Sequence, residues 1–241
     1  MRTGILAHSF SSAFAIYKAV RDVPGQEVYI IISPPPHRSA LTSHLANLAR
    51  FVVASLKGLD PVRLFASGRL IFLRGPLHDP ASVDRLKKLK LDVGLHKTGV
   101  IYRDVTIKAF RLGILNHHIG ILPGYRGRSV LEWSILQGDP VGITVFFIDT
   151  GIDTGARIVV SEQVDISAYK SVGEAKEYLF NLDQVFFPKA LTLLTGSNPS
   201  FEVNDGTGPR YFVMSKLFRG VVEQLLQANE VNPHLPQDSS T

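Results

Sequence analysis

Residues 27–36 read EVYIIISPPP, and this stretch sets how the rest of the chain is interpreted. The run Glu27–Ser33 is β-branched and aromatic, which predicts a strand, and Pro34–Pro36 ends it. On its amino-terminal side, Thr3–Ser9 reads as a buried strand, and Ser11–Val20 reads as a helix with a serine-rich start. The first quarter of the chain therefore alternates strand, helix and strand.

The same alternation continues toward the carboxyl terminus. Apolar residues recur at spacings of three and four between Pro36 and Gly58, which predicts a helix with one apolar face that Gly58 and Pro61 end; they are Leu41, Leu45, Leu48, Val52 and Leu56. Further strands are expected over Leu70–Leu73, Leu91–Leu95, Ile114–His118, Gly142–Asp149 and Ala156–Val164. Further helices are expected over Pro80–Lys90, Asp104–Leu112, Ser129–Gln137 and from the capping box at Ser171 to Leu194, with a kink at Pro188.

Strands that alternate with helices predict an α/β fold: a three-layer, mostly parallel twisted sheet with helices on both faces. Ligands of such sheets bind beyond the carboxyl ends of the strands. Beyond Gly196 the alternation of strands and helices ends. A loop-like stretch is expected over Asn198–Arg210, followed by a last helix within Tyr211–Gln227 and a polar tail. We therefore expect one main domain over residues 1–196 and a short extension over residues 197–241.

Composition narrows the class of protein. The 241 residues are 45% hydrophobic and 20% charged, as in ordinary globular proteins, and no window is apolar enough for a membrane helix. The chain has no cysteine, which excludes disulfides, thiolate zinc sites and a cysteine nucleophile and favours a cytoplasmic location. The net charge of +5 is not gathered into a nucleic-acid-binding stripe, but it suits anionic small molecules.

Polar side chains with catalytic potential stand at the end of one expected strand. The stretch Asn116–Gly127 reads NHHIGILPGYRG. Asn116 and His118 are two residues apart, so strand alternation sends both side chains to the same face, and His117 points the other way. An amide donor beside a histidine can hold a developing oxyanion and move a proton.

A second stretch, Asp149–Gly155, follows the strand expected over Gly142–Asp149 and reads DTGIDTG. Its two carboxylates, Asp149 and Asp153, could bind a metal or poise one acid as a base, and its glycines allow a ligand to approach the backbone closely. Taken alone this pattern is typical of an ordinary turn.

Together the motifs are specific. Asn-x-His, Leu-Pro-x-Tyr-Arg-Gly, Gly-x-Thr and Asp-Thr-Gly follow one another between Leu91 and Val160 as in the 10-formyltetrahydrofolate-dependent formyltransferase family, which this sequence resembles. The resemblance is looser over Met1–Lys90. It implies a Rossmann-like formyltransferase fold and transfer of a formyl group from 10-formyltetrahydrofolate to a primary amine, with no metal.

The resemblance also implies the roles of individual residues. Asn116, His118 and Asp153 match the family's catalytic positions: the first two would hold the oxyanion of the tetrahedral intermediate, and Asp153 would keep His118 charged and help remove the amine proton. The folate would lie along the backbone of a set of positions that comprises Val100, Ile101, Tyr102, Asp149 and Ile152. The acceptor would be bound by residues that include His8, Ser9 and Arg126, although Arg126 could equally tether its own loop.

Departures from the family bear on the acceptor. The run His8–Ser12 lacks the glycines of the phosphate loop found in the member that formylates glycinamide ribonucleotide. The residues after Gly196 are too few for the extra barrel of the tRNA-modifying member, and the chain starts without the regulatory domain of the formyltetrahydrofolate hydrolases. Phe146 stands where some members have a histidine. By elimination we expect an amino sugar linked to a nucleotide.

The alternatives that stay open are a formyltetrahydrofolate hydrolase, a phosphoribosylglycinamide-type formyltransferase and a binding module that keeps the fold without turnover. The partners expected are a small-molecule amine acceptor, no nucleic acid and no membrane, and the sequence allows a homodimer.

Overall fold

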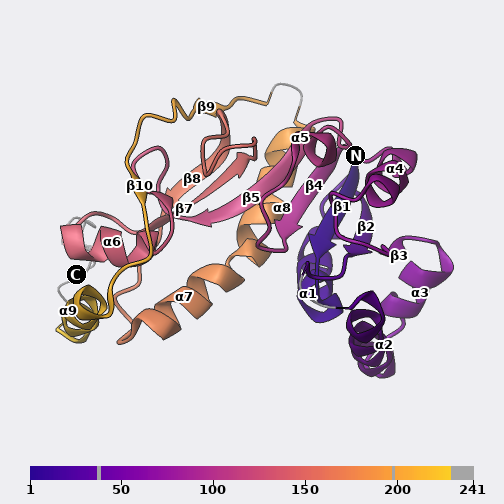
Figure 1. Cartoon of the computed structure of the whole chain (residues 1–241), viewed down its shortest axis with the longest axis horizontal. Coiled ribbons are helices and arrows are strands. Elements are labelled where there is room, and N and C mark those ends of the chain that lie inside the picture. The colour runs from indigo at the N-terminus through magenta and orange to yellow at the C-terminus, as the bar shows by residue number, and fades with distance from the viewer. Residues whose placement is uncertain (37–38, 197–198, 229–241) are drawn as a thin grey trace, which may run out of the picture. The chain divides into compact units, whose positions relative to one another are not determined.

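The computed structural model describes residues 1–36, 39–196 and 199–228. It forms two compact units. The first comprises residues 1–116, 147–150 and 184–199, and the second comprises residues 117–146, 151–183 and 200–241, within the described ranges. Eight strands have the order β3-β2-β1-β4-β5-β7-β8-β9 (Figure 1). The mostly parallel α/β sheet expected from the sequence is thus confirmed.

The first unit is built on parallel strands. They are β1 (Arg2–Ala7), β2 (Glu27–Ile32), β3 (Leu70–Phe72), β4 (Val93–Lys97) and β5 (Gly113–Ile119), whose last three residues belong to the second unit. Ile5 of β1 lies opposite Ile30 of β2 and Leu95 of β4, and all three are fully buried. Parallel strands buried on both faces are nearly continuous apolar runs, which is why the run EVYIIIS predicted a strand correctly.

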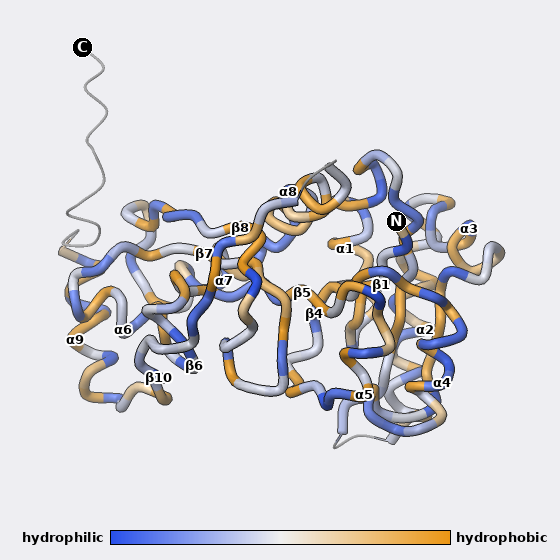
Figure 2. Tube along the Cα trace, turned by 90° about the horizontal axis from the view of Figure 1, so that it is seen from above, coloured by the Kyte–Doolittle hydropathy of each residue, from blue (hydrophilic) through white to orange (hydrophobic). Residues whose placement is uncertain are grey.

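Helices cover both faces of these strands. Helix α1 (Phe10–Val20) packs on β1 and β2 through Ala13 and Ile16. The other face carries a separate core in which Leu6 and Ile31 pack with Leu86 of α4 (Pro80–Leu89) and with residues next to α5 (Asp104–Ile107). Helices α2 (Ala40–Leu56), α3 (Asp60–Ala66) and α8 (Asp183–Thr195) complete the unit. Figure 2 shows hydrophobic residues, in orange, along the tube beside the labels β4 and β5.

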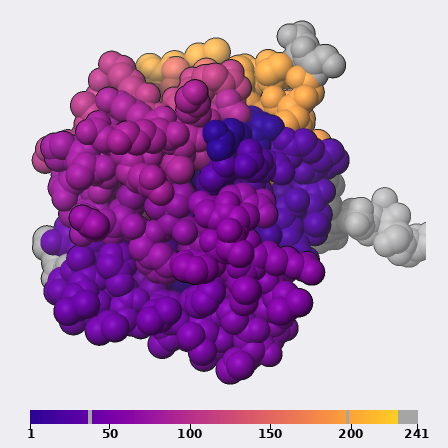
Figure 3. Space-filling model, turned by 90° about the vertical axis from the view of Figure 1, so that its right-hand side faces the viewer, coloured from indigo at the N-terminus to yellow at the C-terminus, as the bar shows by residue number. Residues whose placement is uncertain are grey.

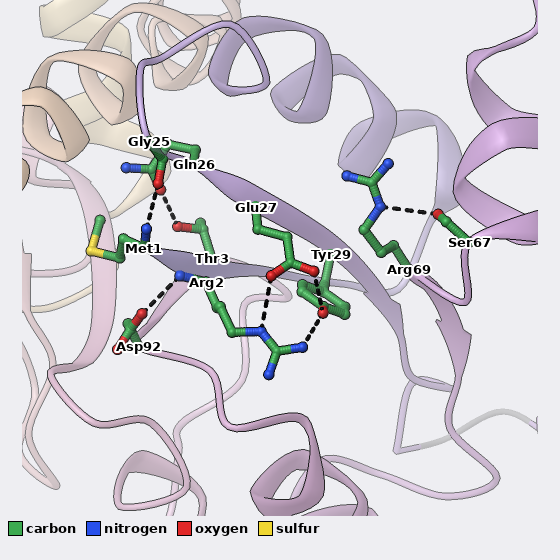
Figure 4. A network of polar contacts seen from close by, with 10 residues as sticks. All are labelled: Met1, Arg2, Thr3, Gly25, Gln26, Glu27, Tyr29, Ser67, Arg69 and Asp92. Carbon is green, nitrogen blue, oxygen red and sulfur yellow. Dashed lines mark hydrogen bonds and ion pairs between the residues drawn. The ribbon is translucent and has the colours of Figure 1, made fainter.

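Polar contacts hold the amino-terminal ends of these strands, the edge opposite to the one where ligands are expected (Figure 4). The Arg2 amide donates to the Asp92 carboxylate over 2.7 Å, and its guanidinium pairs with Glu27 at 3.1 Å and donates to the Tyr29 hydroxyl. Tyr29 donates in turn to Glu27. This hydrogen bond and the positive charge of Arg2 hold the pKa of Glu27 below its usual value, which suits a structural ion pair.

The second unit is built differently. Strands β7 (Gly142–Phe147) and β8 (Arg157–Gln163) pair antiparallel, and β9 (Glu202–Val203) adds antiparallel to β8. Strands β6 (Arg126–Gly127) and β10 (Arg210–Tyr211) form a separate parallel pair. Helix α6 (Val130–Gln137) packs against α9 (Lys216–Gln227), which also contacts α7 (Val172–Asn181).

Three expectations need correction or completion. The long helix predicted from Ser171 to Leu194 is divided at Leu182 into α7 and α8. Pro188 lies inside α8, so the missing backbone amide of this proline does not cause the division. Helix α3 was not foreseen, because Pro61 is tolerated in its first turn. The polar tail expected after Ala228 lies outside the described residues. The domain boundary expected after residue 196 falls next to residues 197 and 198, which also lie outside the described ranges, so this boundary stays a prediction.

Candidate active site

The motif strand is β5, and the boundary between the units falls after Asn116. Asn116 is partly exposed and His118 is buried. The second unit contains His118 and Asp153, and the first contains Asn116 and the loop Val100–Tyr102 that is expected to bind folate.

The imidazole of His118 is held on one side by backbone. Its Nε2 lies 2.7 Å from the carbonyl oxygen of Tyr125, which can only accept, so Nε2 carries a proton and donates. The ring packs edge-on against Phe146 with the centroids 6.3 Å apart. Gly120 makes this packing feasible, because a Cβ there would lie 2.8 Å from Nε2 and 2.9 Å from the Tyr125 oxygen. Nδ1 is left as the nitrogen that faces other groups.

Asp153 faces that nitrogen. Its Oδ1 lies 3.7 Å from Nδ1 of His118, and its Oδ2 accepts a 2.9 Å hydrogen bond from the Gly127 amide. Both side chains are largely buried, at 8% exposed for His118 and 13% for Asp153. Asp153 has a φ of +53°, a left-handed conformation that costs free energy for a residue other than glycine. The loop must therefore be stabilised by its surroundings.

Asn204 supplies that stabilisation, and sequence reasoning missed it. This side chain is 2% exposed; its Nδ2 donates to the carbonyl oxygens of Asp153 at 3.0 Å and of Gly155 at 3.2 Å. Its backbone amide donates to the Ala156 carbonyl, and its Oδ1 accepts from the Gly206 amide. In the sequence it belongs to NDGTG, a run typical of any turn, so the residues alone gave no signal that it reaches the Asp153 loop.

In the first unit, the expected folate-side segments border one core. Val100 and Ile148, the residue before Asp149, both pack against the cluster that contains the buried Tyr102. Ile101, which lies between Val100 and Tyr102 in the loop, is 70% exposed. The structure thus brings the Val100–Tyr102 loop and the end of β7 to the same core, whereas Ile152 belongs to the second unit.

His96 lies next to this loop, near the carboxyl end of β4. Its Nε2 accepts from the Gly99 amide at 3.3 Å, and its Nδ1 lies 2.9 Å from the Tyr102 hydroxyl, which is 3.1 Å from Thr98 Oγ1. Burial lowers the pKa of His96 to about 4, and the positive charges of Lys97 and His8 add to the effect. Burial also raises the pKa of the Tyr102 phenol. Both rings are therefore neutral near pH 7.

The residues expected to bind the acceptor lie in both units. His8 donates from Nδ1 to the Ser33 carbonyl at 2.8 Å, and Ser9 is the N-cap of α1, although its side chain makes no capping hydrogen bond. Arg126 begins β6, one residue before the amide that binds Asp153. Its buried Nε has no hydrogen-bond partner among the described residues.

No group of three or more histidine or acidic side chains among the described residues is arranged to hold a metal ion. No helix in the same residues has both the length and the hydropathy needed to cross a bilayer.

Comparison with known proteins identifies the family of this chain. The fold and the His–Asp pair define an α/β protein with a polar site after its central strands, and a family model described as formyl transferase matches residues 3–191. The chain therefore belongs to the formyl transferase family, and the resemblance seen in the sequence is confirmed. A methionyl-tRNA formyltransferase of Clostridioides difficile (strain 630) is 27% identical over 179 residues, covering 73% of this chain and 58% of that protein.

Solved structures share the fold. A sugar N-formyltransferase from Shewanella sp FDAARGOS_354 has a TM-score of 0.60 at 16% identity, covering 94% of this chain and 87% of that one. A phosphoribosylglycinamide formyltransferase from Bacillus halodurans has a TM-score of 0.56 at 20% identity, covering 82% and 96%. The chain spans about half the length of the curated relatives it matches.

Proposed function

We propose that this protein transfers a formyl group from 10-formyltetrahydrofolate to a primary amine. The observation that carries the proposal is the pairing of His118 with Asp153, in which the Tyr125 carbonyl occupies Nε2 and leaves Nδ1 as the reactive nitrogen. Family membership and the position of Asn116, two residues before His118 on β5, support it.

The reaction needs a proton relay and an oxyanion site. The amine nitrogen forms a bond to the formyl carbon, the bond from that carbon to the folate nitrogen breaks, and the proton lost by the amine replaces the formyl group on the folate. The carboxylate of Asp153 lies 3.7 Å from Nδ1 of His118 and can accept a hydrogen bond or a proton from it, because an ionised carboxylate has only acceptor oxygens. The Nδ1–H group and the Asn116 amide then donate to the oxyanion, and Asp153 receives the amine proton directly or through water.

The donor fits the first unit. The loop Val100–Tyr102 is outside helices and strands, so its backbone groups are available to a pterin, and Val100 and Ile148 offer apolar walls. The neutral His96–Tyr102 pair beside it places no charge against an uncharged ring. We assign Val100, Ile101, Tyr102, Asp149 and Ile152 to donor binding.

For the acceptor we propose an amino sugar linked to a nucleotide, held with the help of His8, Ser9 and Arg126. The unpaired Nε of Arg126, next to the Asp153 contact, suits a phosphate oxygen. Relatives named methionyl-tRNA formyltransferase favour a second candidate, an aminoacyl-tRNA, and related structures named phosphoribosylglycinamide formyltransferase a third.

The test is an acceptor panel. The protein is incubated with 10-formyltetrahydrofolate and, separately, with nucleotide-linked amino sugars, glycinamide ribonucleotide, methionyl-tRNA or no amine, and formylated product, tetrahydrofolate and formate are quantified. Formylated sugar supports the proposal. Formate released equally without any amine identifies a hydrolase instead, and absence of turnover with every acceptor leaves a binding module.

Variants test the assigned chemistry. Asp153→Asn, Asn116→Ala and His118→Ala should each lower turnover by orders of magnitude with folding retained. Asp165→Asn is the matched control, because Asp165 is an exposed carboxylate of the same unit that closes a local turn with Ser167. Normal turnover in Asp153→Asn would refute the mechanism.

A further inference from the structure

Helix α2 exposes the apolar face that its sequence periodicity defines. Leu41, Leu45, Leu48, Val52 and Leu56, called here the leucine stripe, are 69%, 58%, 53%, 47% and 83% exposed. Their spacings of four, three, four and four residues put them on one narrow side of the helix. A helix of a globular domain normally buries such a side, so the stripe is a surface that lacks its cover among the described residues.

The opposite side of α2 fixes this orientation. Asn47 is 1% exposed; its Oδ1 accepts from the Phe10 amide at 2.8 Å, and its Nδ2 donates to the carbonyl oxygens of His8 and Ser43, both at 3.0 Å. His44 donates to the Leu73 carbonyl at 2.9 Å. Because polar side chains with specific partners point inward, the helix cannot rotate the leucines into the core without breaking these hydrogen bonds.

The exposed area is that of an interface. Three more apolar side chains continue the exposed surface from α2 into α3: Leu59, Val62 and Phe65, which are 64%, 44% and 62% exposed. Eight side chains exposed to this degree present roughly 600–900 Å², close to the ~800 Å² that each partner buries in a standard protein–protein interface. Figure 3 shows that the purple part of the chain, which includes this region, forms an outer face of the molecule.

The distribution of charge indicates what covers the stripe. Between Ala40 and Leu56 the only formal charge is Arg50, which lies about half a turn away from Leu41 around the helix. The residues that border the stripe, Thr42 and Ala49 on one side and His44 and Ser55 on the other, carry no carboxylate or ammonium group. A helix that lies on an anionic bilayer is instead rich in Lys and Arg on its polar face, and here that face is turned into the domain.

We propose that the leucine stripe is the interface of a homodimer in which α2 of two copies packs antiparallel. With a two-fold axis near Leu48 and Ala49, Leu41 meets the partner's Leu56, and Leu45 meets the partner's Val52. The stripe is thus complementary to itself, as a two-fold interface requires, and Arg50 of each copy points away from the seam. The proposal is independent of the reaction proposed above.

The first test is the oligomeric state of the full chain. Sedimentation of the wild type over a range of concentrations should show a monomer–dimer equilibrium. Leu48→Glu should raise the dimer dissociation constant about 100-fold or more, because it places two carboxylates next to each other at the axis. Ala46→Glu is the matched control: it adds the same charge to an exposed position on the other side of α2 and should leave the equilibrium unchanged.

The second test uses the lack of cysteine in the natural sequence. Leu48→Cys should form an intermolecular disulfide on mild oxidation. Leu41→Cys alone should not, since the two sulfurs would be roughly 22 Å apart along the antiparallel helices, whereas a mixture of Leu41→Cys and Leu56→Cys should. Leu41→Cys that cross-links with itself would refute the antiparallel arrangement.

Other occupants give distinct results. A wild type that stays monomeric at all concentrations overturns the proposal, as does a dimer that Leu48→Glu leaves intact. Sedimentation of a monomeric chain with phosphatidylcholine–phosphatidylglycerol vesicles, abolished by Leu48→Glu and retained in Ala46→Glu, would assign the stripe to a membrane surface instead.

Discussion

Asn204→Ala tests whether the Asp153 loop is held from outside the motif. The substitution removes two hydrogen bonds that the side chain donates, to the Asp153 and Gly155 carbonyls, and one that it accepts from the Gly206 amide. It leaves the carboxylate of Asp153 and its bond from Gly127 in place. Any loss of activity therefore arises from the position of Asp153, which would make Asn204 a positioning residue.

The size of the effect follows from these contacts. Each buried hydrogen bond contributes about 1 kcal/mol, and the left-handed φ of +53° at Asp153 costs about 1 kcal/mol or more that the hydrogen bonds must offset. Losing about 2–3 kcal/mol from the active conformation of the loop corresponds to a fall in kcat of roughly 30- to 150-fold. KM for the folate should change less than kcat, because four of the five positions assigned to donor binding belong to the first unit and only Ile152 lies in the loop that Asn204 holds.

The assay is steady-state formyl transfer, with melting temperature measured in parallel. Asp205→Ala is the matched control, because the neighbouring Asp205 is exposed and its carboxylate accepts hydrogen bonds from the amide and the hydroxyl of Thr207. Asn204→Asp, which keeps the shape and loses the donor, should be as impaired as Asn204→Ala. In an Asp153→Asn background, Asn204→Ala should cost almost nothing further, since both act through one group. Wild-type kcat in a folded Asn204→Ala protein would refute the reasoning.

Three further outcomes follow from individual contacts. Gly120→Ala should lower kcat by about 10- to 100-fold, because the new methyl group would crowd His118 Nε2 and the Tyr125 carbonyl; an unchanged kcat would contradict the assigned hydrogen bond. Burial alone would raise the pKa of Glu132, but the hydrogen bond from Lys176 at 2.5 Å, the charge of Lys176 and the hydrogen bond from Arg219 outweigh it and hold the pKa below its usual 4.5. Glu132 therefore stabilises the fold above about pH 4.5 and loses this effect as pH falls, and Glu132→Gln should flatten that part of the unfolding free energy against pH. Folding lowers the pKa of His96 from 6.5 to about 4, so as the pH falls through this range the unfolded chain binds a proton that the folded protein does not. The free energy of unfolding should therefore decrease as the pH falls from 6.5 to about 4, by at most about 3 kcal/mol. His96→Gln should remove this decrease in urea unfolding.

The sequence predicted most of the strands because strands buried along their whole length are apolar throughout. β2 and β7 were foreseen within two residues of their observed ends, as their β-branched runs and flanking turn residues leave few alternatives. Ser171 also caps α7 as expected, with its Oγ accepting from the Glu174 amide at 3.2 Å, although Glu174 reaches back to the Lys170 amide and not to that of Ser171. Sequence patterns therefore predicted the structure correctly where the interacting groups are close together in the sequence.

Features that depend on distant partners were out of reach. The leucine periodicity of α2 identified a helix correctly, but a helical period does not say which side the rest of the domain covers; the buried hydrogen bonds of Asn47 decided that. In the same way the motifs identified His118 and Asp153, while the Tyr125 carbonyl, the Gly127 amide and Asn204 that orient them act through backbone atoms or across some fifty residues of sequence. Backbone partners leave no trace in residue identity.

The two sides of α2 connect the proposed dimer to the proposed acceptor site and also keep them separable. Asn47 binds the His8 carbonyl and the Phe10 amide, so it fixes the backbone on either side of Ser9 at the end of β1. The leucine stripe lies on the opposite side of the same helix and makes none of these contacts. Substitutions confined to the stripe should therefore change assembly without changing acceptor KM, because Asn47 still holds the segment. If dissociating the dimer did alter acceptor binding, the effect would travel through the contacts of α2 with this segment, which include the Asn47 hydrogen bonds and the packing of Phe51 against Phe10 with the ring centroids 5.7 Å apart.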